Sequence, residues 1–125
     1  MGFEFALLDA DRRIQVTASG PIDFRETLAA FVTISTWPNF QPQFGVLIDA
    51  RAVEFTPSAH EIEQFARQLG RFKEDVRGRV AVLVEGSLEF GLARMTCSVA
   101  EANGFPMRPF TDLEEARAWL DVEDS

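Results

Sequence analysis

Two short, almost wholly apolar runs constrain the fold of this chain more than any other feature. Residues 44–48 (FGVLI) and 80–84 (VAVLV) are bounded by polar residues, as is typical of strands that are buried on both faces of a sheet. Each run is followed by a segment whose apolar side chains recur at helical spacing. Strands that alternate with helices pair in parallel, because each helix returns the chain to the same end of the sheet. The sequence therefore predicts an α/β fold.

Shorter segments complete this pattern. Residues 3–8 and 13–19 are compatible with strands and flank a polar turn at 9–12, which predicts a hairpin. A last strand is predicted at 107–110. Four helices are predicted to start at side chains that can cap free N–H groups: near Asp23, near Thr56 to Ser58, at Ser87 and at Thr111. The expected order is ββαβαβαβα, with a mixed sheet covered by helices.

Length and charge limit the classes of protein to consider. A chain of 125 residues, 46% of them apolar, predicts a single domain over residues 1–125. Its net charge of -8 repels phosphate backbones, so we expect no nucleic-acid partner. No stretch reaches the length of a membrane span and no basic leader precedes an apolar run, so we expect a cytoplasmic protein.

The chemistry-bearing residues do not form a recognisable catalytic set. Cys97 is the only cysteine, which excludes an intramolecular disulfide and a cysteine-built metal site. His60 is the only histidine, and the sequence shows no partners that would make it part of a triad or a zinc site. We therefore expect no catalytic residue, no metal and no cofactor.

Polar residues follow the two buried strands, at the edge of the sheet where ligands bind in open α/β folds. This rim contains Asp49, Arg51, Glu85 and Ser87. Two carboxylates on one rim could perform acid/base chemistry. Alternatively, Asp49 pairs with Arg51, and Glu85 and Ser87 belong to a loop and a helix cap.

The stretch FTPSAHE at 55–61 places two hydroxyl groups before a predicted helix. Ser58 and Glu61 have the spacing of a capping box, in which each side chain bonds the other residue's backbone N–H. Alternatively, Thr56 caps the helix with Pro57 at its first position. Either arrangement gives the hydroxyl a structural role, and either residue is a candidate phosphoacceptor.

The predicted third helix has two apolar stripes. Leu88, Leu92, Met95 and Val99 form the stripe that we expect to face the sheet. Phe90, Ala93, Cys97 and Ala100 form a second stripe at similar spacing, which makes them candidates for an interface with another chain.

Three stretches carry a family resemblance: FGVLIDARAVEFT at 44–56, RVAVLVEGSLEFGLARM at 79–95 and GFPMRPFTDLEEARAWL at 104–120. With the order of elements, they resemble the SpoIIAA-like proteins, relatives of the STAS domain of bacterial anti-sigma-factor antagonists. The resemblance implies a mixed sheet with helices mainly on one face. It also implies a regulatory serine or threonine at the helix start after the third strand, which corresponds here to Thr56 or Ser58.

Two functional hypotheses follow. The first is a non-enzymatic STAS-like interaction domain that acts by protein–protein contact, as a homodimer, with phosphorylation near Ser58. The alternative is a protein that binds a small apolar ligand or lipid, which the 12 phenylalanines and the resemblance to lipid-exchange domains favour.

Overall fold

The computed structural model describes residues 2–122. Its strands are β1 (Gly2–Leu8), β2 (Arg13–Pro21), β3 (Gly45–Glu54), β4 (Val80–Leu83) and β5 (Met107–Phe110). Its α-helices are α1 (Phe24–Ser35), α2 (Ala59–Leu69), α3 (Ser87–Ala102) and α4 (Leu113–Asp121). Short 3-10 turns follow β1 (Asp9–Asp11) and α2 (Gly70–Phe72). This order confirms the predicted ββαβαβαβα arrangement.

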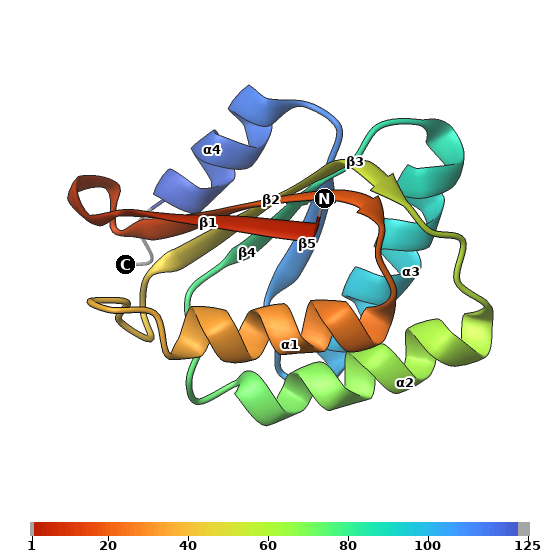
Figure 1. The fold of residues 1–125 in the computed structure, drawn as a ribbon, viewed down its shortest axis with the longest axis horizontal. Helices are drawn as coiled ribbons and strands as arrows, with labels where there is room; N and C mark the ends of the chain where they lie inside the picture. Colours follow the sequence, from red (N-terminus) through yellow and green to blue (C-terminus); the bar gives the residue numbers. More distant parts are fainter. Residues whose placement is uncertain (1, 123–125) are drawn as a thin grey trace.

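The strands form one mixed sheet in the order β1-β2-β3-β4-β5 (Figure 1). β1 and β2 make the predicted antiparallel hairpin, while β2, β3, β4 and β5 pair in parallel. Neighbours in the sheet are also neighbours in the sequence, because each crossover moves the chain by one strand position. The parallel strands thus end at a common edge.

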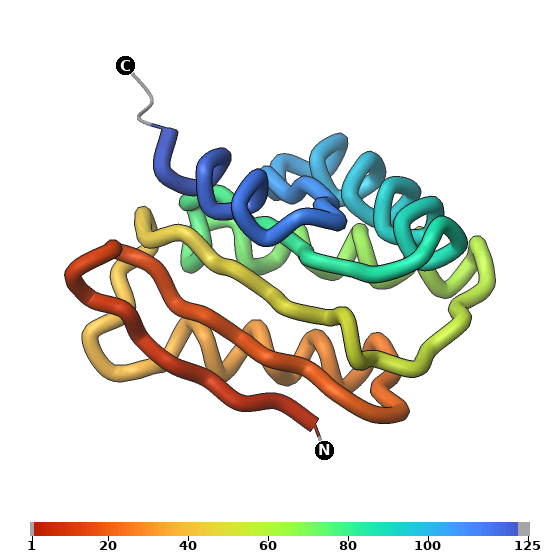
Figure 2. The backbone as a smooth tube through the Cα atoms, turned by 90° about the horizontal axis from the view of Figure 1, so that it is seen from above, coloured from red at the N-terminus to blue at the C-terminus, as the bar shows by residue number. Residues whose placement is uncertain are grey.

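Helices cover the two faces of the sheet unequally, as the tube view in Figure 2 also shows. On one face, Val46 and Ile48 belong to the larger core, to which α1, α2 and α3 contribute Phe31, Phe65 and Cys97. On the other face, Leu47 belongs to a smaller core that is closed by Ala116 and Trp119 of α4. This alternation explains the continuous apolar run of β3 and confirms that the helices lie mainly on one face.

β3 continues six residues beyond the predicted strand at 44–48, as far as Glu54. Thr17 pairs with Asp49 and Ser19 pairs with Ala52, so two residues of β3, Ala50 and Arg51, lie opposite Ala18 alone. This is a β-bulge, and it interrupts the alternation by which a strand is recognised in a sequence. The strand end therefore depends on its pairing with β2.

Two predicted helix starts are confirmed. The Asp23 carboxylate accepts a hydrogen bond from the N–H of Glu26 at 2.9 Å, and the Glu26 carboxylate accepts one from the N–H of Asp23 at 3.3 Å. Ser58 and Glu61 form the same reciprocal pair at the start of α2. The alternative in which Thr56 caps this helix is wrong, because the Ser58 side chain makes the capping bond.

The capping residues predicted for the other two helices are wrong by one position. α3 begins at Ser87, as predicted, but Ser87 is its first residue rather than its cap, and Gly86 holds the cap position without a side-chain bond. At α4, the cap is Asp112, whose carboxylate accepts from the N–H of Glu115 at 3.0 Å, and not Thr111. In both places a neighbouring residue, rather than the predicted one, directly precedes the first helical residue.

The predicted orientation of α3 is also wrong. Leu88 and Met95, expected to face the sheet, are 60% and 47% exposed, whereas Cys97 and Ala100 are 4% and 0% exposed. Cys97 and Ala100 thus lie in the chain's own core, with Phe90 and Ala93 packed against it. Rotation of α3 is set by its packing on α2 and β5, which hydrophobicity along the helix does not encode.

Within residues 2–122, none of the helices combines the length and the apolar character that crossing a membrane requires.

Candidate apolar ligand site

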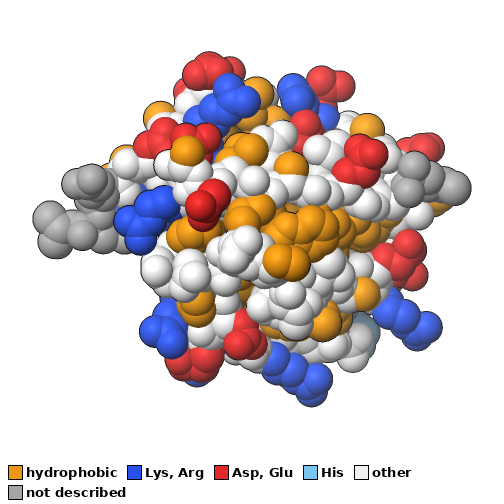
Figure 3. Space-filling model, turned by 60° about the vertical axis from the view of Figure 1, so that its left-hand side comes forward, with side chains coloured by type: hydrophobic (Ala, Val, Ile, Leu, Met, Phe, Trp, Pro, Cys, Tyr) orange, Lys and Arg blue, Asp and Glu red, His pale blue; other side chains and the backbone are white. Residues whose placement is uncertain are grey.

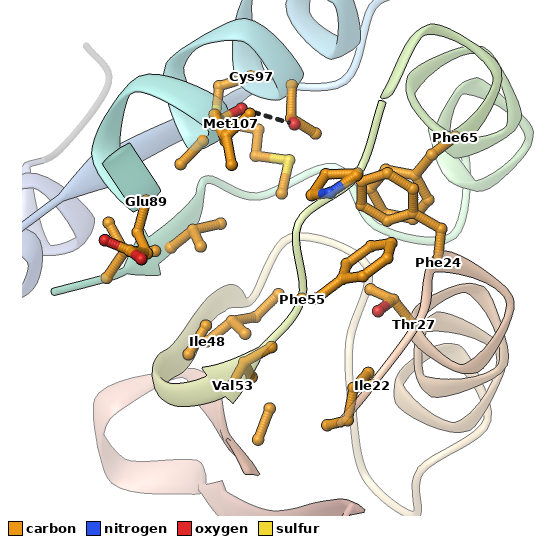
Figure 4. Close-up of a pocket in the computed structure, with 18 of the residues that line it drawn as sticks. Ile22, Phe24, Thr27, Ile48, Val53, Phe55, Phe65, Glu89, Cys97 and Met107 are labelled. Carbon is orange, nitrogen blue, oxygen red and sulfur yellow. Dashed lines mark hydrogen bonds between the residues drawn. The ribbon is translucent and has the colours of Figure 1, made fainter. Parts of the chain in front are cut away.

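A cavity of about 150 Å³ lies between the sheet and the three helices α1, α2 and α3 (Figure 4). Its floor includes Ile48, Ala50 and Val53 of β3, and one wall includes Ala93 and Cys97 of α3. The cavity lies toward the carboxyl ends of the parallel strands, where the first turns of α1, α2 and α3 diverge from the sheet. This is the general position for ligands in open α/β sheets.

The β-bulge in β3 shapes the cavity floor. Along a regular strand, residues two apart share a face, so Ile48 and Ala50 point to the same side. Val53 and Phe55 would point to the opposite side if this alternation continued. The extra residue shifts the phase by one position, so both pairs line the cavity.

Three phenylalanines from different elements meet at one side of the cavity (Figure 4). Phe24 of α1 stacks on Phe65 of α2 with 4.2 Å between ring centroids and 6° between planes. Phe55 meets Phe24 edge to face at 4.9 Å and 86°. Both geometries are favourable for aromatic rings, so this side of the cavity is a packed hydrocarbon wall.

The polar groups of the wall are already engaged. The Thr27 hydroxyl donates to the Asp23 carbonyl at 3.0 Å, and the Thr96 hydroxyl donates to the Leu92 carbonyl at 2.9 Å. Burial raises the pKa of Cys97 from 9.0 to about 12, so the thiol is neutral at physiological pH. The interior of the cavity therefore offers a ligand almost only apolar contacts.

Glu89 is the charged residue of the lining, and it is exposed at the first turn of α3. Its carboxylate lies over Gly86, where an added Cβ would sit 2.1 Å from Glu89 Oε1. Gly86 has a φ of +103°, which residues with a side chain rarely adopt. Glycine at this position thus allows both the turn and the close approach of the carboxylate.

The predicted polar rim forms a separate feature. Arg51 donates to Asp49 through Nε at 3.0 Å, through Nη2 at 2.8 Å and through its backbone N–H at 3.2 Å. The side-chain bond to Arg51 is the main reason that the pKa of Asp49 is lowered. This confirms the alternative in which the two residues pair, and a carboxylate held in its ionised form is a poor general acid or base near neutral pH.

None of the four rim residues is among those described as lining the cavity. Asp49 follows Ile48 directly, so it points to the opposite face of the sheet. Glu85 is exposed, and its charge contributes to raising the pKa of Arg51. Ser87 is exposed at the start of α3. In residues 2–122, no group of histidine, cysteine and carboxylate side chains could hold a metal ion.

Ser58 and Thr56 lie next to the cavity but do not line it, while Pro57 between them does. The Ser58 hydroxyl oxygen accepts from the N–H of Glu61 at 3.2 Å, and a Glu61 carboxylate oxygen accepts from the N–H of Ser58 at 3.0 Å. Ser58, Thr56 and His60 are all exposed. The candidate phosphoacceptors are thus accessible, and the Ser58 oxygen already has a capping role.

The sequence favoured an apolar ligand only through its 12 phenylalanines, of which Phe24, Phe55 and Phe65 line the cavity. It did not indicate Pro57 or the floor of β3. The available signal was the loss of alternation after Asp49, which marks a bulge once the strand is known to continue.

Comparison with known proteins supports the fold. No protein-family model matches the chain, and no curated protein matches it significantly. A solved structure of an uncharacterised protein from Shewanella loihica PV-4, described as a DUF3478 family member with a SpoIIAA-like fold, aligns with a TM-score of 0.59. The alignment covers 95% of this chain and 92% of that chain at 19% sequence identity. The chain therefore has a SpoIIAA-like fold.

Proposed function

We propose that this protein binds a small apolar molecule, or the apolar end of an amphipathic one, without a chemical step. The observation that carries the proposal is the cavity of about 150 Å³ with hydrocarbon walls. Apolar cavities of about this size accept molecules of about the size of benzene. The neutral Cys97 thiol and the engaged hydroxyls of Thr27 and Thr96 favour an apolar ligand over a charged one.

A ligand that fills this space would stabilise the folded protein, because it binds to the folded state alone. The gain would come from apolar surface of the ligand and of the cavity wall that is removed from water.

Titration with 1-octanol, followed by NMR chemical shifts, tests the proposal. We expect shifts at the amides of Ala50, Val53 and Ala93, which line the cavity. Ala93→Leu should fill the space and abolish these shifts. Ala102→Leu, an exposed site on the same helix, is the matched control and should bind 1-octanol as the wild type does. Shifts that are absent, or that persist in Ala93→Leu, would refute the proposal.

A second candidate function is contact with a partner protein through α3. Leu88 and Met95 are among the large apolar side chains that the fold leaves exposed, and they lie on the same helix. Phosphorylation of Ser58 would place negative charge beside Glu61 and alter the start of α2, and phosphorylation of Thr56 would add charge two residues before this cap. This regulation is part of the second proposal.

A photo-crosslinking residue at position 88 tests this second function in cells that produce the protein. A crosslinked partner at position 88, absent when the same residue is placed at exposed Glu114 on α4, would support it. Equal labelling at both positions would refute it. Mass spectrometry of the purified protein tests the modification of Ser58 and Thr56.

A further inference from the structure

β1 is an edge strand whose outer side is unpaired within residues 2–122. It pairs only with β2, and Figure 2 shows it as the outermost strand of the sheet. In such a strand every second residue turns its N–H and C=O groups outward. β1 is seven residues long, so these groups form an extended row that can bind another strand.

The opposite edge strand, β5, carries protection that β1 lacks. β5 has only four residues. Val80 N–H donates to the Pro106 carbonyl and Val84 N–H donates to the Phe110 carbonyl, both at 2.9 Å, so Pro109 between them faces the free edge. Proline has no N–H to offer there, and short strands with an edge proline resist pairing. β1 contains no proline and no lysine, and Glu4 is its single charge.

The free edge of β1 lies beside partly exposed apolar side chains. Phe3, Phe5 and Leu7 pack against the larger core but keep some exposed surface. The rings of Phe3 and Phe5 are 6.3 Å apart, and Phe5 stacks on Trp37 at 5.3 Å, which makes a continuous aromatic row. Figure 3 shows hydrophobic side chains gathered in a band across the middle of the molecule, between charged side chains above and below.

We propose that β1 pairs in antiparallel fashion with β1 of a second copy of this chain, joining two sheets across a two-fold axis. Full overlap of the seven residues places the axis at Phe5. Phe3 then lies opposite Leu7, and the two Phe5 side chains face each other, so the apolar row continues across the interface.

The residue pattern of β1 favours a second copy as the occupant. In this register Glu4 of each copy lies directly opposite the uncharged Ala6 of the other, and the two Glu4 side chains are diagonal neighbours on the exposed face rather than directly opposed. The faces of the two strands also match. Because the axis passes through Phe5, the apolar residues of one copy lie on the same face of the joined sheet as the apolar residues of the other. This inference goes beyond the proposed ligand binding and does not depend on it.

Substitution of Ala6 tests the pairing and its register. Ala6 is exposed and pairs with Gln15 of β2, so a charged residue should be tolerated in the folded chain. Light scattering after size exclusion should give twice the mass of one chain for the wild type. Ala6→Glu places like charges opposite each other twice and should raise the dissociation constant by roughly 2- to 30-fold.

Two matched variants test whether the effect of Ala6→Glu comes from like charges at positions 4 and 6. Ala6→Lys meets Glu4 of the second copy and should dimerise at least as tightly as the wild type. The double variant Glu4→Lys with Ala6→Glu restores opposite charges and should recover the dimer. Circular dichroism establishes that each variant is folded. Hydrogen exchange should show β1 amides that become protected only in the dimer.

Three results would overturn the proposal: a wild-type protein that remains a monomer up to about 1 mM, a dimer with unprotected β1 amides, or equal effects of Ala6→Glu and Ala6→Lys. A monomer whose β1 amides are protected by some other protein would equally refute pairing between two copies. Each of these outcomes is independent of 1-octanol binding, so the two proposals can fail separately.

Discussion

Replacing Ala93 with leucine should stabilise the folded protein, because the larger side chain would occupy existing empty space. Ala93 lies on α3 and lines the cavity of about 150 Å³. The substitution adds three carbon atoms, and burial of each contributes about 0.8 kcal/mol, or about 2.4 kcal/mol together. Ordering the leucine side chain costs roughly 0.5–1 kcal/mol. The expected net gain in the free energy of unfolding is about 1.5 kcal/mol.

The sign of this change separates a real cavity from a packed core. Inserting the same atoms into a filled interior costs roughly 1–3 kcal/mol, because neighbouring side chains must leave their preferred rotamers. In urea unfolding, a gain of about 1.5 kcal/mol moves the midpoint upward by roughly 0.5–1.5 M at an unchanged slope.

The exposed Ala102→Leu control should change stability by less than about 0.5 kcal/mol. A midpoint that falls for Ala93→Leu while the control stays constant would refute the cavity. A midpoint that rises for both variants would show a helix effect of leucine and would not support the cavity.

Three further predictions concern single side chains. Ser58→Ala should lower the unfolding free energy by about 1 kcal/mol, measured in urea, whereas Ser58→Asp should keep the cap and most of the stability. The lowered pKa of Asp49 means that its pairing with Arg51 stabilises the fold above the ordinary pKa of 3.8 and that this contribution is lost as the pH falls further. Asp49→Asn should therefore be less stable than wild type at neutral pH, and a constant difference down to acid pH would contradict this. The raised pKa of Cys97 predicts stability that is present below pH 9 and is lost as the pH rises toward 12. Cys97→Ala should lack this added loss, and fast alkylation of Cys97 in the folded protein near neutral pH would contradict its burial.

Local signals were sufficient for the helix start at Asp23, and they gave Ser58 as one of two candidate caps for α2. A capping box needs only two residues three positions apart, so it can be recognised without knowing the fold. At α3 the start at Ser87 was predicted correctly but its cap was not, because Gly86 holds the cap position without a side-chain bond. Gly86 has a positive φ, which glycine adopts most readily, and glycine has no side chain that could serve as a recognisable polar cap.

The candidate site could be predicted only in part. The number of phenylalanines favoured an apolar site, but Phe24 meets its partners Phe55 and Phe65 from 31 and 41 positions away in the chain, which the sequence does not indicate. The floor depends on Ala50 and Arg51 lying opposite one residue of β2, which is a long-range pairing. The polar rim was predicted at the strand ends, but alternation across the sheet places Asp49 on the face opposite the cavity.

By itself, the sequence determined the order of the elements, the mixed sheet and the α1 cap, because these follow from apolar runs and from contacts within a few residues. Only the tertiary structure decided which stripe of α3 is buried, how the bulge in β3 directs Val53 into the cavity, and that the outer edge of β1 has no partner strand within residues 2–122. These features depend on which surfaces meet after the chain has folded. Hydrophobicity records that a residue is buried, but not the element against which it packs.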